Sequence, residues 1–459
     1  MPMNSQFPQS EKWDDTTKKV VETIRSHLHR EPQPNLSTIQ KESRKSRRSK
    51  GPFLHCKATI PVPAEDDIRQ LFLQVVDEIE KIDYQPPNYA PVDVEWTSFT
   101  GTGKGTSESN FNTAEAEVEK YEKLAKASVT DLVILHVHGG AYCQGSPETS
   151  RSTTTRLAKL TRGRVCSVDV RLAPQNMFPS AEIDAILAYL SLLYPPNSSF
   201  HTPIPPDKIV FTGDSSGASE LYAVLCFILH IHRKNGPLRT YKFNGKDVTI
   251  PLPAGIATIG MSGDQISSLP SYKNNSKHDI FVGIPWEWPD YPSCDLWPAK
   301  PPRISVYYEN LSTCHPLISA TLISDWTGAP PMWFGMGEEL AIDSARVMAQ
   351  RASAQGVTVV WKEFEAMPHG FLSLPVLSSM KQSEICFQSW ADFCIECVQR
   401  PKLIESSASI VRFKGAKEEE KNLYQHGDLS FDQAEQLMRT SMIKKDKWFQ
   451  TMLTRKSKM

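Results

Sequence analysis

Short apolar runs alternate with amphipathic stretches over most of the chain from about residue 130 onward. Stretches such as Ser180–Leu193 and Ser344–Gln355 space their apolar residues for one buried helix face. The runs between them have strand length and are rich in β-branched and aromatic residues: 132–137, 165–170, 208–212, 255–259, 332–336 and 357–364. Strands and helices that alternate at this spacing form βαβ units. The pattern therefore predicts an α/β protein with a mostly parallel central sheet and helices on both faces.

Two regions depart from this alternation. Residues 264–328 are rich in Pro, Trp, Tyr and Ser, including Trp286, Trp288 and Trp297, which is typical of a lid or cap inserted between two core strands. After residue 400, a capping-box sequence at Ser430–Gln433 predicts the start of a helix. We therefore expect a core over residues 126–400, with the insertion at 264–328, and a C-terminal helical appendage over residues 401–459.

Composition and charge exclude several classes of protein. The chain has 459 residues and a formal net charge of −1, so no global field attracts nucleic acid or an anionic membrane. No stretch approaches the roughly 20 apolar residues of a membrane span, and the polar first residues do not read as a secretory signal. Nine scattered cysteines favour reduced thiols in a cytoplasmic protein. The basic run at 41–50 reads as a solvated connector, with a nuclear-localisation or polyanion-binding patch as the alternative.

The pentapeptide Gly213–Gly217 has the pattern G-x-S-x-G, with Ser215 at its centre. An expected strand, Lys208–Thr212, precedes it, and an apolar helical stretch, Ala218–His232, follows. This strand–turn–helix context presents a serine hydroxyl above the edge of a sheet, where the helix N-terminus favours developing negative charge. Ser215 is therefore the candidate nucleophile.

Two further segments supply what a serine nucleophile requires. The turn His138–Ala141, rich in glycine, follows a strand and offers backbone N–H groups for an oxyanion, as does the N–H of Ser216. His369 lies on a short loop after a late strand, where a histidine can act as the general base for a serine at the same edge of the sheet. Three carboxylates after the preceding strand compete as the third member: Glu338, Glu339 and Asp343. Asp343 is more simply a first-turn residue of the following helix.

These segments resemble the hormone-sensitive-lipase-like branch of α/β hydrolases, which includes arylacetamide-deacetylase-type esterases. The matching segments are H-G-G-A at 138–141, D-V-R-L-A-P at 169–174, G-D-S-S-G at 213–217 and M-P-H-G-F at 367–371. The sequences of these segments are most similar to those of filamentous-fungal members. The resemblance covers roughly residues 85–400.

The resemblance implies a role for each matched position. Ser215 would be the nucleophile, His369 the base and Glu339 the acid, with Glu standing where the family usually has Asp. The oxyanion donors would be Gly140, Ala141 and Ser216, with Gly139 shaping the turn. A cap built from the N-terminal segment 1–125 and from 264–328 is also implied. Ala218 departs from the family's glycine and adds a methyl group at a crowded point of the turn.

The function expected from these residues is the hydrolysis of carboxylic esters of small apolar or acylated metabolites. An amidase, lactonase or acyltransferase would use the same triad, and a non-catalytic ligand-binding protein on the same fold is a further alternative. No metal, nucleotide or flavin motif is visible, so we expect no cofactor. The expected partner is a small-molecule ester, with no nucleic acid and no membrane span; the oligomeric state is open, a homodimer included.

Overall fold

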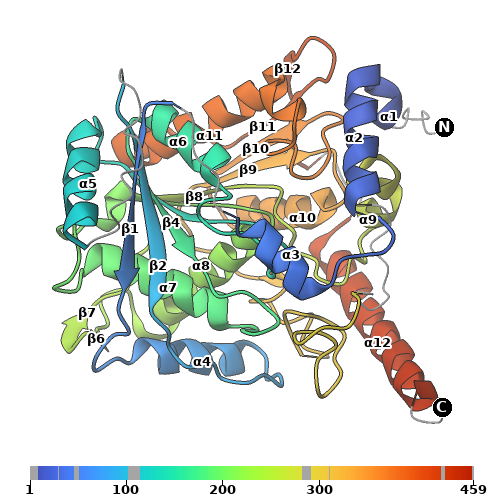
Figure 1. The fold of residues 1–459 in the computed structure, drawn as a ribbon, viewed down its shortest axis with the longest axis horizontal. Coiled ribbons are helices and arrows are strands. Elements are labelled where there is room, and N and C mark those ends of the chain that lie inside the picture. The colour runs from blue at the N-terminus through green and yellow to red at the C-terminus, as the bar shows by residue number, and fades with distance from the viewer. Residues whose placement is uncertain are drawn as a thin grey trace.

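The computed structural model describes residues 9–28, 30–45, 51–101, 114–281, 291–309, 311–424 and 429–456. Within these residues a ten-stranded sheet runs through the molecule in the order β1-β2-β4-β3-β5-β8-β9-β10-β11-β12 (Figure 1). Its strands are β1 (Phe53–Ile60), β2 (Val92–Phe99), β3 (Val133–Val137), β4 (Arg164–Asp169), β5 (Ile209–Asp214), β8 (Gly255–Ile259), β9 (Met332–Gly337), β10 (Val359–Phe364), β11 (Ser407–Val411) and β12 (Glu418–Glu420). A separate hairpin pairs β6 (Tyr241–Phe243) with β7 (Lys246–Val248).

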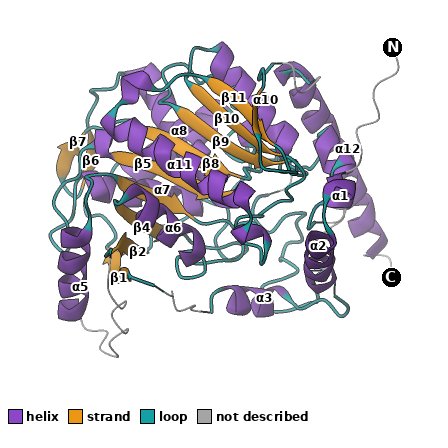
Figure 2. Cartoon of the chain, turned by 90° about the horizontal axis from the view of Figure 1, so that it is seen from above, coloured by secondary structure: helices purple, strands orange, loops and turns teal. Residues whose placement is uncertain are grey.

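Strands β4 to β11 pair in parallel, whereas β1, β2 and β12 pair antiparallel at the two ends of the sheet. Helices lie on both faces (Figure 2). They are α1 (Gln9–Lys12), α2 (Asp15–Leu28), α3 (Leu36–Ser43), α4 (Ile68–Ile79), α5 (Ala114–Ala127), α6 (Arg151–Thr161), α7 (Ser180–Leu193), α8 (Ser215–Asn235), α9 (Pro270–Asn274), α10 (Ile342–Ala354), α11 (Lys381–Gln399) and α12 (Phe431–Lys456). The predicted mostly parallel sheet covered on both faces is confirmed.

The pleat of the central strands divides the core into two layers. In β3 the side chains of Val133, Leu135 and Val137 join one buried cluster, while Ile134 joins the other. Because successive side chains of a strand point to opposite faces, a strand buried on both faces is mostly apolar. All five residues of β3 are buried, and four of them are apolar, the exception being His136. Helices α4, α7, α8 and α10 contribute to the first cluster, and α6 and α11 to the second.

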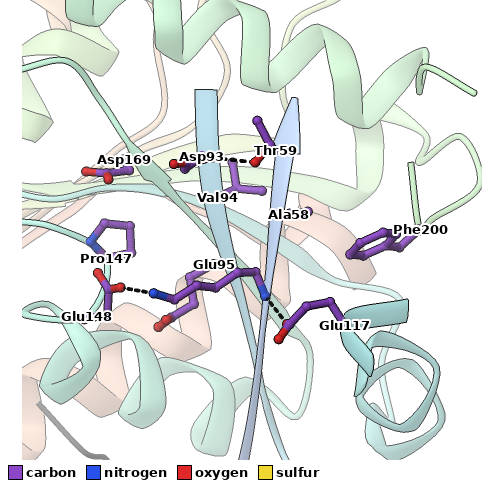
Figure 3. Close-up of a pocket in the computed structure, with 11 residues that line it drawn as sticks. Ala58, Thr59, Asp93, Val94, Glu95, Glu117, Pro147, Glu148, Asp169 and Phe200 are labelled. Carbon is purple, nitrogen blue, oxygen red and sulfur yellow. Dashed lines mark hydrogen bonds and ion pairs between the residues drawn. The ribbon is translucent and has the colours of Figure 1, made fainter. Parts of the chain in front are cut away.

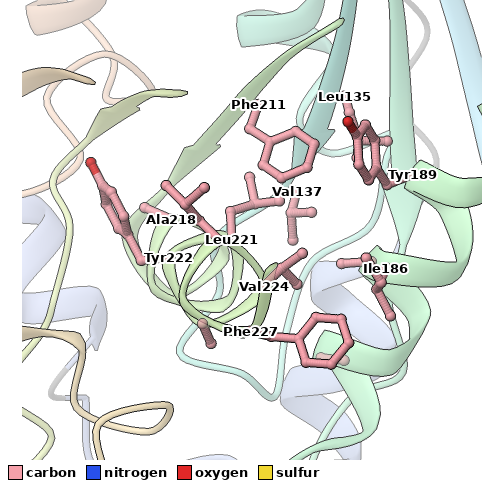
Figure 4. Close-up of a cluster of buried hydrophobic side chains, with 14 of the residues drawn as sticks. Leu135, Val137, Ile186, Tyr189, Phe211, Ala218, Leu221, Tyr222, Val224 and Phe227 are labelled. Carbon is pink, nitrogen blue, oxygen red and sulfur yellow. The ribbon is translucent and has the colours of Figure 1, made fainter. Parts of the chain in front are cut away.

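Helix α8 lies in the first layer and fixes the segment that begins at Ser215. Its residues Leu221, Val224 and Phe227 pack among buried side chains of β3, β5 and α7 (Figure 4). Fifteen residues of this 21-residue helix are buried, including Ala218 with no exposed surface. The departure from glycine at Ala218 therefore places its methyl group inside a packed apolar layer.

The sheet extends past residues 125 and 400, between which we expect the core. Strands β1 and β2 precede residue 126, and β11 and β12 follow residue 400, yet all four belong to the same sheet as the core. In β2 the residues Val92, Val94 and Trp96 alternate with more polar ones, which is the pattern of a strand. β11 begins with the small residues Ser407–Ser409, and β12 has only three residues, all glutamate, so neither strand gives a continuous apolar signal.

The C-terminal region ends in the helix that the capping box predicts. The N–H of Ser430 donates to Gln433 Oε1 at 2.8 Å, and the N–H of Gln433 donates to Ser430 Oγ at 3.2 Å, which is the reciprocal capping pair. The apolar residues of this helix, α12, do not all lie on one buried face, because Met438 and Phe449 are buried while Trp448 is 39% exposed. Across the described residues, every helix is too short or too polar to cross a bilayer.

Candidate active site

The carboxyl ends of parallel strands meet at one edge of the sheet, and the candidate residues come from three such ends. Ser215 follows β5, Glu339 follows β9 by one intervening residue, and His369 lies on the loop after β10. In the order of the sheet these strands are separated only by β8. The fold therefore brings together residues that are up to 154 positions apart in the chain.

The turn at Ser215 is sharp and holds its backbone in an unusual conformation. Ser215 has φ +50°, which non-glycine residues seldom adopt. The flanking glycines are required by close approach, since a Cβ on Gly217 would lie 2.3 Å from the carbonyl oxygen of Val137. A Cβ on Gly213 would lie 2.9 Å from the backbone nitrogen of Ala218. The turn therefore exposes the hydroxyl of Ser215 at the start of α8.

A chain of hydrogen bonds joins Ser215, His369 and Glu339. The Nε2 atom of His369 lies 2.9 Å from Ser215 Oγ, and its Nδ1 atom lies 3.0 Å from Glu339 Oε1. Glu339 is 1% exposed and His369 is 8% exposed, so the pair is shielded from water. This is the arrangement of a nucleophile, a base and an acid that orients the base.

The two competing carboxylates face elsewhere. Asp343 lies in the first turn of α10, where Oδ2 accepts the N–H of Ser271 at 2.8 Å and Oδ1 accepts from Arg346 at 3.1 Å. Glu338 accepts the N–H of Ala366 at 3.0 Å. Of the three carboxylates, only that of Glu339 hydrogen-bonds to the ring of His369.

The electrostatic surroundings favour a charged His369. Burial lowers the pKa of His369, but the charges of Glu339, Asp279 and Asp214 outweigh it and raise the pKa to about 9. Burial also raises the pKa of Glu339, and the neighbouring His369 opposes that rise. The site is therefore built to stabilise an imidazolium, the form that the base takes after accepting a proton.

The glycine-rich turn after β3 passes directly beside the nucleophile. A Cβ on Gly139 would lie 2.5 Å from Asp214 Oδ2 and 3.0 Å from Ser215 Cβ. Gly140 has φ +139°, and Ala141 has φ +51°. A Cβ on Gly140 would lie 2.2 Å from the carbonyl oxygen of Gln144, so this turn requires glycine there.

The N–H groups of this turn divide into two kinds. Burial raises the pKa of Asp214, and the N–H of Gly139, which faces this carboxylate, opposes that rise. Within the described residues, the N–H groups of Gly140 and Ala141 donate to no protein acceptor. Ser216 is the second residue of α8, where backbone N–H groups have no partner within the helix. The three candidate oxyanion donors are therefore available to a ligand.

The structure adds residues that the sequence did not single out. The carboxylate of Asp279 accepts the backbone N–H of His369 at 3.1 Å, and the ring of Phe281 lies 5.5 Å from the ring of His369. Trp13 Nε1 donates to the carbonyl oxygen of Ala366 at 2.6 Å. No motif marks these residues, because their role depends on contacts between distant segments. Trp286 and Trp288, predicted for the cap, lie outside the described residues, whereas Trp297 is buried.

His136 in β3 and His138 in the turn that follows have separate hydrogen-bond partners. His136 Nδ1 lies 2.9 Å from Thr212 Oγ1, and His138 Nδ1 lies 2.9 Å from the carbonyl oxygen of Gly139. In the part of the chain that the structure describes, no three His, Cys, Asp or Glu side chains gather as metal ligands would. These contacts suit histidines that support the strand and the turn.

A pocket of about 420 Å³ lies away from this site (Figure 3). Strands β1 and β2 form its floor, and charged side chains such as Lys57, Glu117 and Glu148 line it. Lys57 forms an ion pair with Glu148, and its backbone N–H donates to Glu117 at 2.7 Å. The pocket shares no residue with the hydrogen-bonded chain at Ser215 and is not part of the candidate active site.

Comparisons with known proteins agree with the fold described above. A profile of the alpha/beta hydrolase fold matches residues 134–373. An esterase of Acinetobacter venetianus is 30% identical over 261 residues, which are 56% of this chain and 72% of that protein. An acetyl-hydrolase of Streptomyces hygroscopicus is 27% identical over 237 residues, which are 51% of this chain and 67% of that protein.

Solved structures show the same fold. The crystal structure of EstE5 soaked with p-nitrophenyl butyrate superposes with a TM-score of 0.57 at 18% identity, covering 84% of this chain and 99% of that one. An esterase from the bacterial hormone-sensitive lipase family gives a TM-score of 0.56 at 19% identity, with the same coverage.

Proposed function

The chain belongs to the alpha/beta hydrolase fold family, and from this premise we propose that it is a serine hydrolase that cleaves carboxylic esters. Ser215 Oγ attacks the ester carbonyl while His369 takes its proton, and Glu339 stabilises the resulting imidazolium. The N–H groups of Gly140, Ala141 and Ser216 bind the tetrahedral oxyanion, and Gly139 shapes the turn that carries them. His369 then returns the proton to the leaving alcohol, and water releases the acyl group.

One observation carries this proposal: the unbroken hydrogen-bonded chain from Ser215 through His369 to Glu339, at 2.9 and 3.0 Å. A ligand-binding protein needs neither this alignment nor the strained φ of +50° at Ser215. Both are costly features that a nucleophile requires. They favour an enzyme over a non-catalytic binding protein on the same fold.

The substrate that we propose is a small ester with an apolar or acetyl group. The surroundings of the base are aromatic, with Phe281 beside His369, and with Tyr142 stacked on Tyr307 at 3.7 Å just beyond the oxyanion turn. The names of two relatives, an esterase and an acetyl-hydrolase, support the same class. Tyr307 and Phe281 come from residues 264–328, which supports a capping role for this segment.

The test is the hydrolysis of p-nitrophenyl esters from acetate to decanoate by the wild type, Ser215→Ala and Ser219→Ala. Ser219 is a matched control, because it is a buried serine of the same helix whose hydroxyl donates to the carbonyl oxygen of Ser262 at 2.9 Å. We expect Ser215→Ala to lose several orders of magnitude in kcat and Ser219→Ala to keep most of it. A folded wild type that is no more active than Ser215→Ala on every ester would refute the proposal. Parallel assays on amides and lactones separate the related reactions.

A further inference from the structure

Asp279 connects the two loops that carry His369 and Glu339. Its Oδ1 atom accepts the backbone N–H of His369 at 3.1 Å, and its Oδ2 atom accepts the backbone N–H of Leu340 at 2.9 Å. Leu340 directly follows Glu339 in the chain. The two oxygens of one carboxylate therefore hydrogen-bond to the backbones of the loops that carry the base and the acid. The ring of His369 hydrogen-bonds to Glu339.

Asp279 is fully buried, and its charge acts on the base. The charged groups that face His369 are Glu339, Asp279 and Asp214, and all three favour the imidazolium. Burying a carboxylate is costly unless hydrogen bonds and opposite charge offset it. Asp279 has two such N–H donors from the triad loops, a third from Ile280 at 2.6 Å, and the ring of His369 nearby.

The turn that carries Asp279 is itself held by helix α2. The side chain of Arg25 donates from Nε to the carbonyl oxygen of Asp279, and from a terminal nitrogen to the carbonyl oxygen of Lys277 at 2.7 Å. Because a guanidinium offers several donors in one plane, Arg25 fixes both carbonyls at once. The position of Asp279 is therefore set by a segment that lies far from the nucleophile in the chain.

We propose that Asp279 is a positioning residue of the triad, which holds the loops of His369 and Glu339 at one separation and supplies a second negative charge to the imidazolium. This inference rests on the proposed function, in which His369 is the general base. Asp279 touches neither the substrate nor Ser215 in this scheme. It acts through His369 and Glu339.

The experiment compares Asp279→Asn with Asp264→Asn. Asp264 is a matched control in the same segment: it is 1% exposed and accepts the N–H groups of Ile266, Ser268 and Leu269 at 2.9, 2.7 and 3.0 Å. Both changes keep the size of the side chain, remove a buried negative charge and turn one acceptor into a donor. Only Asp279 contacts the triad loops.

We expect Asp279→Asn to lower kcat by on the order of tenfold or more at a nearly unchanged KM, because small displacements of catalytic groups cost rate rather than binding. Since His369 acts as a base only when neutral, kcat/KM rises with pH through the pKa of His369. Removing the charge of Asp279 lowers that pKa, so the rise should move to lower pH by about one unit. Asp264→Asn should leave the pH dependence in place.

Equal pH profiles for Asp279→Asn and the wild type would overturn the proposal, as would an equal shift in Asp264→Asn. If Asp279→Asn does not fold, Arg25→Met decides the positioning role. It keeps the carboxylate but releases its turn, and an unchanged kcat would then refute the inference.

A readout without turnover separates this inference from the proposed function. The low-field proton resonance of a histidine bonded to a carboxylate reports the titration of His369 by NMR, even in Ser215→Ala. We expect Asp279→Asn to lower that titration midpoint in the Ser215→Ala background. An unmoved midpoint refutes the role of Asp279. An inactive wild type refutes only the esterase proposal.

Discussion

The resemblance to hormone-sensitive-lipase-like esterases implies aspartate at the position of Glu339. Replacing Glu339 by aspartate tests whether the length of its side chain matters for activity. The hydrogen bond from His369 Nδ1 to Glu339 Oε1 is 3.0 Å long. Aspartate is shorter by one carbon–carbon bond, about 1.5 Å. The loop cannot follow freely, because the carbonyl oxygen of Glu339 accepts from Asn275 at 2.9 Å and the N–H of Leu340 is bound to Asp279.

The gap to His369 would therefore grow to about 4.5 Å, which is beyond hydrogen-bond distance. A hydrogen bond to a charged group contributes about 1.5–3 kcal/mol, so kcat/KM should fall roughly 10- to 150-fold in Glu339→Asp. At an effective dielectric constant of about 20, the attraction weakens from about 5.5 to about 3.7 kcal/mol. That loss lowers the pKa of His369 by about one unit. The acidic limb of kcat/KM should accordingly move to lower pH, and further still in Glu339→Gln.

The assay is the initial rate of p-nitrophenyl ester hydrolysis from pH 5 to 9.5, with thermal unfolding as a check on folding. Asp343→Asn is the control. Asp343 hydrogen-bonds to Ser271 and Arg346 and not to His369, so this variant should leave the acidic limb of kcat/KM unmoved. If Glu339→Asp is as active as the wild type, activity does not depend on the length of the Glu339 side chain. A large loss in Asp343→Asn instead would transfer the role of the acid to that residue.

Three further changes test other parts of the structure. Gly140→Ala places a methyl group 2.2 Å from the carbonyl oxygen of Gln144 and should lower kcat on the order of a hundredfold or more, whereas Gly236→Ala, in open space, should not. Ala218→Gly should lower the free energy of unfolding by about 1–2 kcal/mol in urea titrations, because it loosens the helix and removes a buried methyl group; a gain would mean that the methyl is strained. Glu220 is buried in α8 with no hydrogen bond to Oε2, and burial raises its pKa far above the usual 4.5. Since the unfolded chain ionises first, the wild type should lose up to about 1.4 kcal/mol of stability per pH unit above 4.5, and Glu220→Gln should lose less between pH 5 and 8.

The sequence predicts the core strands because a strand buried on both faces is mostly apolar. The start of β8 at Gly255 and the bounds of α7 follow directly from the pattern, and the apolar run at 357–364 becomes β10 two residues later. The edge strands β1 and β12 escape prediction because they are half-exposed or short, so their side chains leave no continuous apolar signal.

The site residues likewise divide into those that a local sequence pattern marks and those that only the fold brings together. Ser215 and His369 are marked by local sequence, since a tight turn needs glycines at fixed positions around them. Asp279 carries no such mark: its neighbours in space, His369 and Leu340, lie 90 and 61 residues away. Its place depends on how the inserted segment crosses the end of the sheet, which no local pattern encodes.

The contact between Trp13 and Ala366 has a consequence for the order in which the protein is made. The two residues are 353 positions apart, and Arg25 likewise reaches a turn more than 250 residues later. At about 5 to 20 residues per second, a ribosome needs roughly 20 to 70 seconds to deliver the second partner. During that interval the side chains of Trp13 and Arg25 lack these hydrogen-bond partners. The segment that carries Trp13 and Arg25 should therefore dock at the catalytic end of the sheet only after the loop of His369 has been made.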